Sequence, residues 1–163
     1  MSELLKFQPL QITDASLIHH TWGAQAENFT YLTSPVLATI DLAQNYINQT
    51  LKFPASKAYH IMIDGEVCGL VKALVDGHRA QVGYVVDKSY WGKGIATQAV
   101  KFITVELNNT PSIQRIWATC ALENRGSQRV LEKCGYQREG VLRNWVVYPA
   151  QGDRAHDNYV YSL

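Results

Sequence analysis

The chain has 163 residues, about the length of one domain, and its 47% hydrophobic content with 18% charged residues is enough to bury a sizeable core. The net charge is +1 and no run of Lys and Arg stands out, so composition gives no reason to expect a nucleic acid or a membrane surface as partner. The first residues, MSELLKFQPL, lack a basic region followed by a long apolar stretch, and no apolar run approaches the roughly 18 residues that cross a bilayer. We therefore expect a single domain over residues 1–163, located in the cytoplasm.

The first third of the chain predicts a strand, two helices and a loop. Residues 7–13 (FQPLQIT) are typical of a strand, and Asp14 is placed to cap a helix that runs to about residue 27. Residues 28–38 mix aromatic side chains with a Ser-Pro pair and predict a loop, after which helical spacing returns over residues 39–49.

The hydrophobic period then changes to two. Residues 58–63 and 67–75 flank an Asp-Gly turn at 64–65, and a second Asp-Gly turn at 76–77 precedes residues 79–86. These patterns predict an antiparallel meander of three strands.

The second half of the chain predicts a helix over residues 94–108 and then a strand at 113–120, which implies a right-handed parallel crossover. A second helix, over 125–134, is closed by Gly135 as its C-cap. Two further strands are expected at 136–142 and 156–162. The predicted class is α+β, or mixed α/β, built around one twisted sheet.

The turn that leads into the helix at 94–108 is the clearest candidate for binding chemistry. The first turn of a helix has unpaired N–H groups and about half a positive charge, and Gly92, Lys93 and Gly94 lead directly into it. The spacing fits neither a P-loop nor a dinucleotide fingerprint. These residues alone therefore predict either an anion site or a simple connecting turn.

Three segments together resemble the GCN5-related N-acetyltransferase (GNAT) superfamily: QVGYVV at 81–86, WGKGIA at 91–96 and ENRGSQRVLEKCGY at 123–136. The resemblance covers residues 7–163 and is closest to the branch similar to bacterial enzymes that acetylate ribosomal-protein N-termini. The family's turn pattern, Gln/Arg-x-x-Gly-x-Gly/Ala, falls on Trp91, Gly94 and Ala96, so its first position departs. The resemblance implies a mixed sheet of about six to seven strands with helices on both faces, splayed into a V between the strands at 80–86 and 113–120.

The resemblance also implies acetyl-CoA as cosubstrate. The backbone of residues 84–86 would pair with its pantetheine arm, and the N–H groups of residues 92–97 would hold its pyrophosphate. Gly83, inside a strand, indicates a bulge or a close backbone approach, and a bulge here would splay this strand from the one at 113–120 and open a slot for the arm. The cofactor-binding residues implied are Tyr84, Val85, Val86, Gly92, Lys93, Gly94, Ile95, Ala96, Thr97, Asn124 and Ser127, with Asn124 also placed as an N-cap.

The usual catalytic side chains of the family are absent. Attack of an amine on a thioester needs a neutral nucleophile, a donor for the oxyanion and a proton for the departing thiolate. Many relatives supply a Tyr acid and a strand Glu, but Leu131 stands at the Tyr position, and Gln81 and Thr119 stand at the strand positions.

Other groups are therefore expected to assist. The thiol of CoA has a pKa near that of free Cys, so a hydroxyl can help it leave, and Ser127 is our candidate. A backbone N–H near Tyr84 would hold the oxyanion, and the amine would lose its proton through water to Glu27 or Asp157. The predicted catalytic residues are thus Ser127, Tyr84 and Glu27.

The acceptor is expected to meet the loop at 28–38 and the strand GVLRNWVV, with Tyr31, Arg143 and Trp145 as its binding residues. The three cysteines are predicted to be ordinary thiols rather than nucleophiles, and the five histidines have no metal-ligand spacing, so no metal site is predicted.

The sequence therefore predicts an acetyl-CoA-dependent N-acetyltransferase that acts on a primary amine, such as a protein or peptide N-terminus, by direct attack in a ternary complex. Three alternatives remain: a CoA-binding or sensor module with weak catalysis, an acetyltransferase of a small-molecule amine, or a binding protein for another phosphate ligand. The expected partner is an amine-bearing acceptor, with no nucleic acid and no membrane, and the protein is expected to be a monomer or homodimer.

Overall fold

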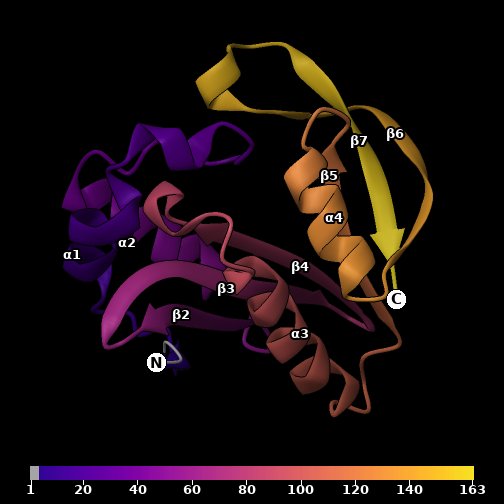
Figure 1. Cartoon of the computed structure of the whole chain (residues 1–163), viewed down its shortest axis with the longest axis horizontal. Coiled ribbons are helices and arrows are strands. Elements are labelled where there is room, and N and C mark those ends of the chain that lie inside the picture. Colours follow the sequence, from indigo (N-terminus) through magenta and orange to yellow (C-terminus); the bar gives the residue numbers. More distant parts are fainter. Residues whose placement is uncertain (1–3) are drawn as a thin grey trace.

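The computed structural model describes residues 4–163, and its framework is a seven-stranded mixed sheet (Figure 1). The strands follow the order β1-β2-β3-β4-β5-β7-β6, and every neighbouring pair is antiparallel except β4 and β5, which are parallel. The strands are β1 (Leu5–Pro9), β2 (Lys57–Ile63), β3 (Glu66–Asp76), β4 (Arg79–Val86), β5 (Arg115–Ala121), β6 (Gln137–Val147) and β7 (Ala155–Ser162). The predicted mixed class and the number of strands are confirmed.

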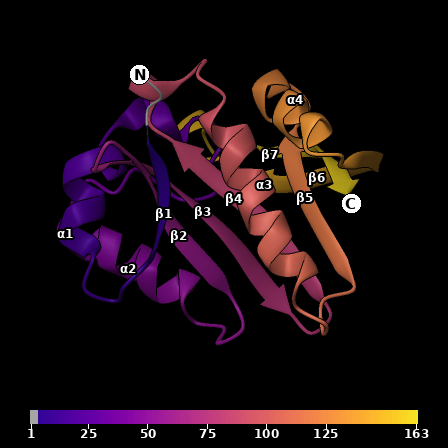
Figure 2. The ribbon, with the colours of Figure 1, turned by 60° about the horizontal axis from the view of Figure 1, so that its bottom comes forward.

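Helices cover both faces of the sheet (Figure 2). The helices α1 (Ala15–Ile18) and α2 (Ile40–Thr50) lie on one face, whereas α3 (Ile95–Asn108) and α4 (Arg125–Lys133) lie on the other. Thr39 caps α2, since its side chain accepts a hydrogen bond from the N–H of Leu42 at 3.2 Å, and Gly135, with φ of +87°, closes α4 as predicted. None of the helices within residues 4–163 has the length and apolar character needed to cross a membrane.

The strands β4 and β5 separate soon after they begin. Residues 79–81 of β4 pair with residues 115–117 of β5, and the ladder between these strands ends there. Beyond this point β5 continues with β7 and β6 as a second arm, which is turned away from β1–β4 (Figure 1). The predicted V-shaped splay is therefore present, and it leaves backbone groups of β4 along residues 82–86 facing an opening.

Gly83 does not cause this opening. The register between β3 and β4 is continuous along the whole of β4, so the bulge predicted at Gly83 is wrong. The splay arises where parallel pairing with β5 ends, not from an extra residue in β4.

The long N-terminal helix predicted from Asp14 is also wrong. After α1 the chain forms a π-helical turn (His19–Gly23) and then a 3₁₀ turn (Ala26–Phe29). Gly23 permits this change, because a Cβ at this position would lie 2.7 Å from the carbonyl oxygen of Ile18. The side chain of Asp14 caps no helix; it accepts a hydrogen bond from the N–H of Gln11 at 2.8 Å.

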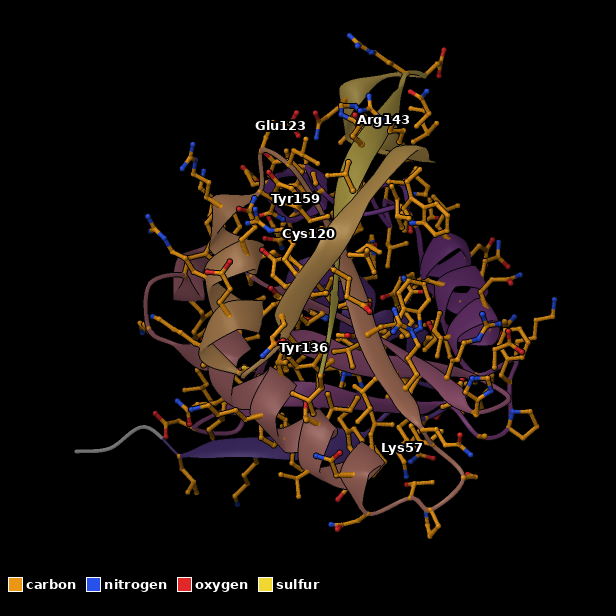
Figure 3. All side chains as sticks on the ribbon, turned by 90° about the vertical axis from the view of Figure 1, so that its right-hand side faces the viewer. Lys57, Cys120, Glu123, Tyr136, Arg143 and Tyr159 are labelled. Atoms are coloured by element: carbon orange, nitrogen blue, oxygen red, sulfur yellow. The ribbon has the colours of Figure 1, made fainter. Side chains whose placement is uncertain are left out.

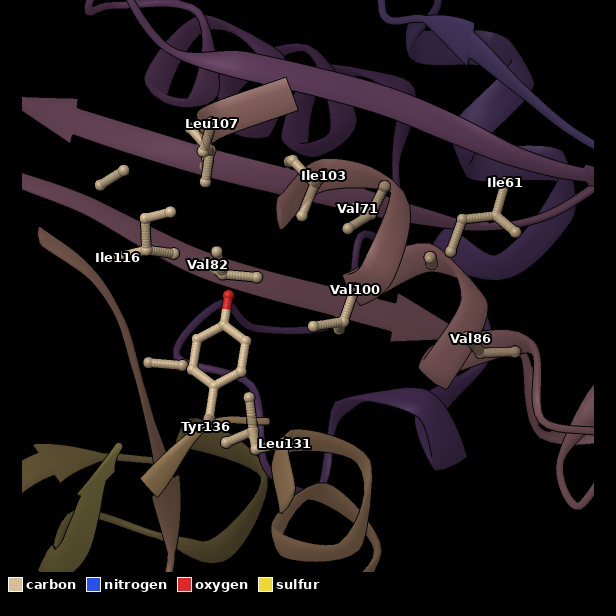
Figure 4. Packing of buried hydrophobic residues seen from close by; sticks show 14 of the residues in the cluster. Ile61, Val71, Val82, Val86, Val100, Ile103, Leu107, Ile116, Leu131 and Tyr136 are labelled. Atoms are coloured by element: carbon tan, nitrogen blue, oxygen red, sulfur yellow. The ribbon is translucent and has the colours of Figure 1, made fainter. Parts of the chain in front are cut away.

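Two hydrophobic cores fix β4 from both sides. Figure 4 shows the core under α3, where Val82 of β4 packs near Leu131 and Tyr136. The hydroxyl of Tyr136 is hydrogen-bonded to that of Thr104 at 2.8 Å, so this buried polar group is satisfied. Val85 packs into the second core, beneath α1 and α2. Because β4 is held on both faces, the position of its free edge is well defined.

Candidate active site

Two adjoining cavities lie at the splay and share part of their lining. One, of about 560 Å³, lies between the starts of α3 and α4, and we call it the α3–α4 cavity. The other, of about 430 Å³, lies beneath residues 31–34 of the loop that precedes α2, and we call it the aromatic cavity. The residues that line both are Tyr31, Leu32, Tyr84, Val85, Asn124 and Ser127. Cofactor-binding and acceptor-binding residues predicted from separate parts of the sequence therefore lie at one junction.

The turn before α3 contains two glycines with positive φ, Gly92 at +80° and Gly94 at +75°. A Cβ at either position would meet no atom within 4 Å, so the backbone conformation rather than crowding favours glycine. Gly94 is the N-cap residue of α3, and within the described chain no side chain caps this helix. The first-turn N–H groups are therefore available to an anion, and Ala96 connects them to the α3–α4 cavity.

Trp91 stands at the mouth of the α3–α4 cavity. Its indole Nε1 donates a hydrogen bond to the carbonyl oxygen of Val86 at 2.7 Å, while 55% of its surface stays exposed. Val86 is one of the residues predicted to pair with the pantetheine arm. Its carbonyl oxygen already accepts this hydrogen bond from Trp91. The sequence did not predict that Trp91 lines the α3–α4 cavity, because there this residue stood out only as a departure from the first position of the family's turn pattern.

Asn28 fixes the 3₁₀ turn that carries Glu27 beside the end of β4. Its side-chain Nδ2 donates to the carboxylate of Asp87 at 2.9 Å, and its Oδ1 accepts from the N–H of Lys88 at 2.9 Å. Glu27 itself is exposed and lines the α3–α4 cavity. The structure therefore places this predicted catalytic carboxylate in the lining of the α3–α4 cavity and not in that of the aromatic cavity.

The hydroxyl groups of Tyr84 and Ser127 meet where the two cavities join, with their oxygens 2.8 Å apart. The N-cap of α4 fixes this geometry, because the Oδ1 of Asn124 accepts from the N–H of Ser127 at 3.1 Å. Burial raises the pKa of Tyr84 above its ordinary value, so its phenol stays neutral over the physiological range. The sequence predicted a role for the backbone of Tyr84, but the contact of its side chain was missed.

The positions where relatives carry their acid and base hold neutral side chains. Leu131 is 1% exposed and packs in the core under α3, and Gln81 and Thr119 line the aromatic cavity. None of these side chains titrates. These three positions therefore supply neither an acid nor a base.

Five aromatic side chains give the aromatic cavity its name: Tyr31, Tyr46, Tyr84, Trp145 and Tyr148. The rings of Tyr31 and Tyr148 meet edge to face, with centroids 6.0 Å apart. The hydroxyl of Tyr148 donates to the Oδ1 of buried Asn158 at 2.9 Å, so the polar end of this ring is satisfied within the wall.

A bulge in β6 shapes the outer wall of this cavity. The register between β6 and β7 shifts between Leu142 and Val146, and Asn144 adopts a positive φ of 47°. The N–H of Asn144 donates a hydrogen bond to the carboxylate of Asp157 at 2.8 Å. Asp157, the second carboxylate that the sequence suggested for proton transfer, thus accepts a backbone hydrogen bond in this bulge.

Two of the three predicted acceptor residues share the aromatic cavity. Tyr31 and Trp145 both line it. Arg143 is exposed, outside the lining of both cavities, and Figure 3 places it on the β6–β7 hairpin beyond Cys120. The structure therefore brings Tyr31 and Trp145 together and leaves Arg143 apart.

Cys120 lines the aromatic cavity, but its environment disfavours a thiolate. Burial raises its pKa to about 11, and burial also raises the pKa of Cys134. Both thiols therefore remain protonated near neutral pH, whereas a nucleophilic cysteine needs a lowered pKa. Residues 4–163 contain no group of His, Cys, Asp and Glu side chains arranged to hold a metal ion.

Comparison with known proteins identifies the family. Residues 5–137 match the family model of the acetyltransferase (GNAT) domain. The chain is 30% identical over 151 residues to the probable N-acetyltransferase YjcK of Bacillus subtilis (strain 168), which covers 83% of this chain and 82% of that protein. The chain therefore belongs to the GNAT family of acetyltransferases, as its motifs predicted.

Solved structures share the same fold. RimL, a ribosomal L7/L12 α-N-protein acetyltransferase in complex with coenzyme A, matches with a TM-score of 0.87 and 18% identity over 99% of this chain and 94% of that one. The microcin C7 self-immunity acetyltransferase MccE, in complex with acetyl-CoA and AMP, matches with a TM-score of 0.85 and 21% identity over 98% and 91%. As a GNAT enzyme the protein uses acetyl-CoA as cosubstrate. The N–H groups at the start of α3, which no side chain caps within the described chain, suit its anionic pyrophosphate.

Proposed function

We propose that the protein transfers the acetyl group of acetyl-CoA to a primary amine inside the splay between β4 and β5. The observation that carries this proposal is the junction of the two cavities at Tyr84, Asn124 and Ser127. One cavity extends to the glycine turn of α3, and the other is walled by aromatic side chains. Donor and acceptor entering from the two cavities would meet beside two hydroxyl groups, without a covalent enzyme intermediate.

The α3–α4 cavity has the groups that the donor requires. The backbone N–H groups of residues 92–97 would hold the pyrophosphate, and Lys93 would add a positive charge. The free edge of β4 at residues 84–86 would pair with the amides of the pantetheine arm. When bound there, acetyl-CoA supplies an activated acyl group as a thioester.

Ser127 is proposed to donate a hydrogen bond to the departing thiolate, which leaves as the thiolate and is protonated afterwards through water by the proton that the amine releases. The neutral phenol of Tyr84 can donate to the Oγ of Ser127, and this leaves the Ser127 hydrogen free to point into the junction. A backbone N–H within residues 84–86 would stabilise the oxyanion. The two hydroxyls together would stabilise the leaving thiolate by hydrogen bonding, since Leu131 stands where relatives carry an acid.

Water is proposed to take the proton of the amine. Within the described chain, neither a carboxylate nor a histidine lines the aromatic cavity, and Glu27 lines only the α3–α4 cavity. A site without a strong base suits an amine that is substantially neutral at the working pH. A peptide α-amine, with a pKa of about 8, meets this condition better than a lysine side chain at about 10.4.

We therefore propose an α-amine as acceptor: the N-terminus of a peptide or protein, or a small α-amine. The fold shared with RimL is compatible with a ribosomal protein as acceptor, and the fold shared with MccE is compatible with a small molecule. The cytoplasmic location and the monomeric or dimeric state remain predictions.

A CoA-binding module without turnover is the second candidate, and the neutral side chains of Leu131, Gln81 and Thr119 favour it. A thiol-release assay separates the two. We expect acetyl-CoA and a suitable α-amine to yield free thiol together with an acceptor that is heavier by one acetyl group in mass spectrometry. Tight CoA binding without thiol release from any acceptor would support the binding module instead.

A further inference from the structure

Lys72 contributes the only charged side chain to the aromatic cavity among the residues that the structure describes. It lies on β3 directly opposite Gly83 of β4. A Cβ on Gly83 would lie 3.8 Å from Cε and 4.0 Å from Cγ of Lys72, so the lysine stem lies over β4 at the residue without a side chain. The stem of Lys72 thus passes over Gly83 on its way into the cavity.

The ammonium group of Lys72 is held by an aromatic ring. Its Nζ lies 4.5 Å from the centre of the Tyr46 ring, a cation–π contact that fixes the charge at the cavity wall. None of the ion pairs within residues 4–163 includes this ammonium group. A half-buried cation with only a ring as partner favours an incoming anion.

The position of this charge limits the acceptor. Lys72 lies opposite the residue that precedes Tyr84, so its charge belongs to the acceptor side of the junction. A second positive charge on the acceptor would be repelled here, and the described lining offers no carboxylate to compensate it. The rings of Tyr31, Trp145 and Tyr148 leave apolar surface for the rest of the molecule.

We infer that the acceptor is a primary amine that carries a carboxylate a few bonds from its nitrogen and an apolar group beside it. Lys72 binds the carboxylate, and the aromatic side chains cover the apolar group. This inference rests on the proposed acetyl transfer and excludes polyamines as the preferred acceptors. The carboxylate has two possible sources: the α-carboxylate of an amino acid, or an acidic side chain near a peptide N-terminus.

The test compares matched acceptors in the thiol-release assay. One pair is free phenylalanine and phenylalanine amide; one series is Ser-Glu-Phe, Ser-Gln-Phe and Ser-Lys-Phe as peptide amides; spermidine is the polycation. In either the phenylalanine pair or the peptide series, we expect kcat/KM to be at least tenfold higher for the acceptor with a carboxylate than for its neutral counterpart. This ratio corresponds to about 1.4 kcal/mol. The cationic members should be the poorest acceptors.

Two variants of Lys72 and one control locate the preference. Lys72→Met keeps the length of the stem without the charge, so the ratio of acidic to neutral kcat/KM should fall below threefold. Lys72→Glu should reverse the preference toward the cationic peptide. Lys57→Met removes a lysine from β2 that lies outside both cavities (Figure 3), and it should keep the ratio of the parent.

Calorimetric titration of CoA into each variant separates the failure of this inference from failure of the proposed function. Turnover with neutral or cationic acceptors equal to the acidic ones, or a preference that survives in Lys72→Met, would overturn the inference and leave acetyl transfer intact. CoA binding without turnover of any acceptor would contradict both. A preference within the phenylalanine pair alone would assign an amino acid as acceptor, and one within the peptide series alone would assign an acidic N-terminus.

Discussion

The two cavities are built in different ways. The α3–α4 cavity is lined by three short segments, which are residues 27–32, the end of β4 with the turn into α3, and the start of α4. The groups that it offers to an anion are the backbone N–H groups of the turn. The aromatic cavity uses side chains from the loop after α1, from α2, β3, β4, β5 and from the bulge of β6. A site made of backbone tolerates many sequences and suits a common donor, whereas a site made of dispersed side chains can change with the acceptor.

The largest effect should come from a negative charge in the backbone site. Gly94→Asp should weaken CoA affinity at least a hundredfold, because it opposes a pyrophosphate held by two or three charge-assisted hydrogen bonds of about 1.5–3 kcal/mol each. Gly94→Asn is the matched control: it has nearly the same shape and the same backbone strain without the charge, and it should stay within tenfold of the parent. Calorimetric titration of CoA measures both.

The positive φ of Gly94 also affects stability. Both variants should melt at lower temperature than the parent, because a residue with a Cβ at φ of +75° costs about 1 kcal/mol even for Asn and Asp, which tolerate this region best. A folded Gly94→Asp protein that binds CoA like the parent would show that the turn is only a connector.

The junction should respond in turnover rather than in binding. Ser127→Ala keeps the backbone N–H that Asn124 caps, so CoA affinity should change less than threefold while kcat falls ten- to a hundredfold. Tyr84→Phe removes only the hydroxyl that contacts Ser127 and should lower kcat about tenfold.

Tyr136→Phe is the control for these hydroxyl variants. It also removes a buried phenol from a hydrogen bond, here with Thr104 in the core, and should lower stability without changing kcat. Equal losses of kcat in Tyr84→Phe and Tyr136→Phe would reduce the role of Tyr84 to structural support.

The pH dependence of kcat/KM should be set by the pKa of the acceptor amine and not by a titrating group of the protein. Because water accepts the proton, kcat/KM should rise with pH in proportion to the neutral fraction of the amine and level off near its pKa, about 8 for a peptide α-amine. Burial raises the pKa of Tyr84 above its ordinary value, so this phenol keeps its proton as pH rises and adds no falling limb below pH 10. A fixed rising limb for acceptors of different pKa would instead indicate a base in the protein, and Glu27→Gln would then identify or exclude that carboxylate.

The cysteine variants should have the smallest effect. Cys120→Ala and Cys134→Ala should keep kcat within about tenfold of the parent, roughly 1.4 kcal/mol of barrier, because burial holds both thiols in the protonated form. Mass spectrometry of the enzyme after incubation with acetyl-CoA is the check. An acetylated cysteine, together with loss of activity in its Ala variant, would indicate a covalent intermediate.

The sequence predicted the parts of the fold that local patterns encode. Alternating hydrophobic residues gave β2, β3 and β4, and the glycines at 92, 94 and 135 marked a turn and a helix end that the structure contains. The helix predicted from Asp14 failed because its end depends on Gly23 fitting closely against the Ile18 carbonyl, a packing contact that periodicity does not report.

The parts of the site that were missed depend on pairing between distant segments. Tyr84 contacts Ser127 across 43 positions of sequence, and Lys72 lies over Gly83 because β3 and β4 adopt one particular register. The glycine at 83 was noticed in the sequence, but only the register shows that it lies beneath the side chain of Lys72 on the neighbouring strand.

Direct transfer at the junction of the two cavities is tested most directly by initial rates of thiol release with acetyl-CoA and an α-amine acceptor varied together. If both substrates bind at once, double-reciprocal plots should intersect, and no thiol should form without acceptor beyond slow hydrolysis. Parallel lines, or a burst of thiol before acceptor is added, would show that the acetyl group first passes to the enzyme and would contradict attack in a ternary complex.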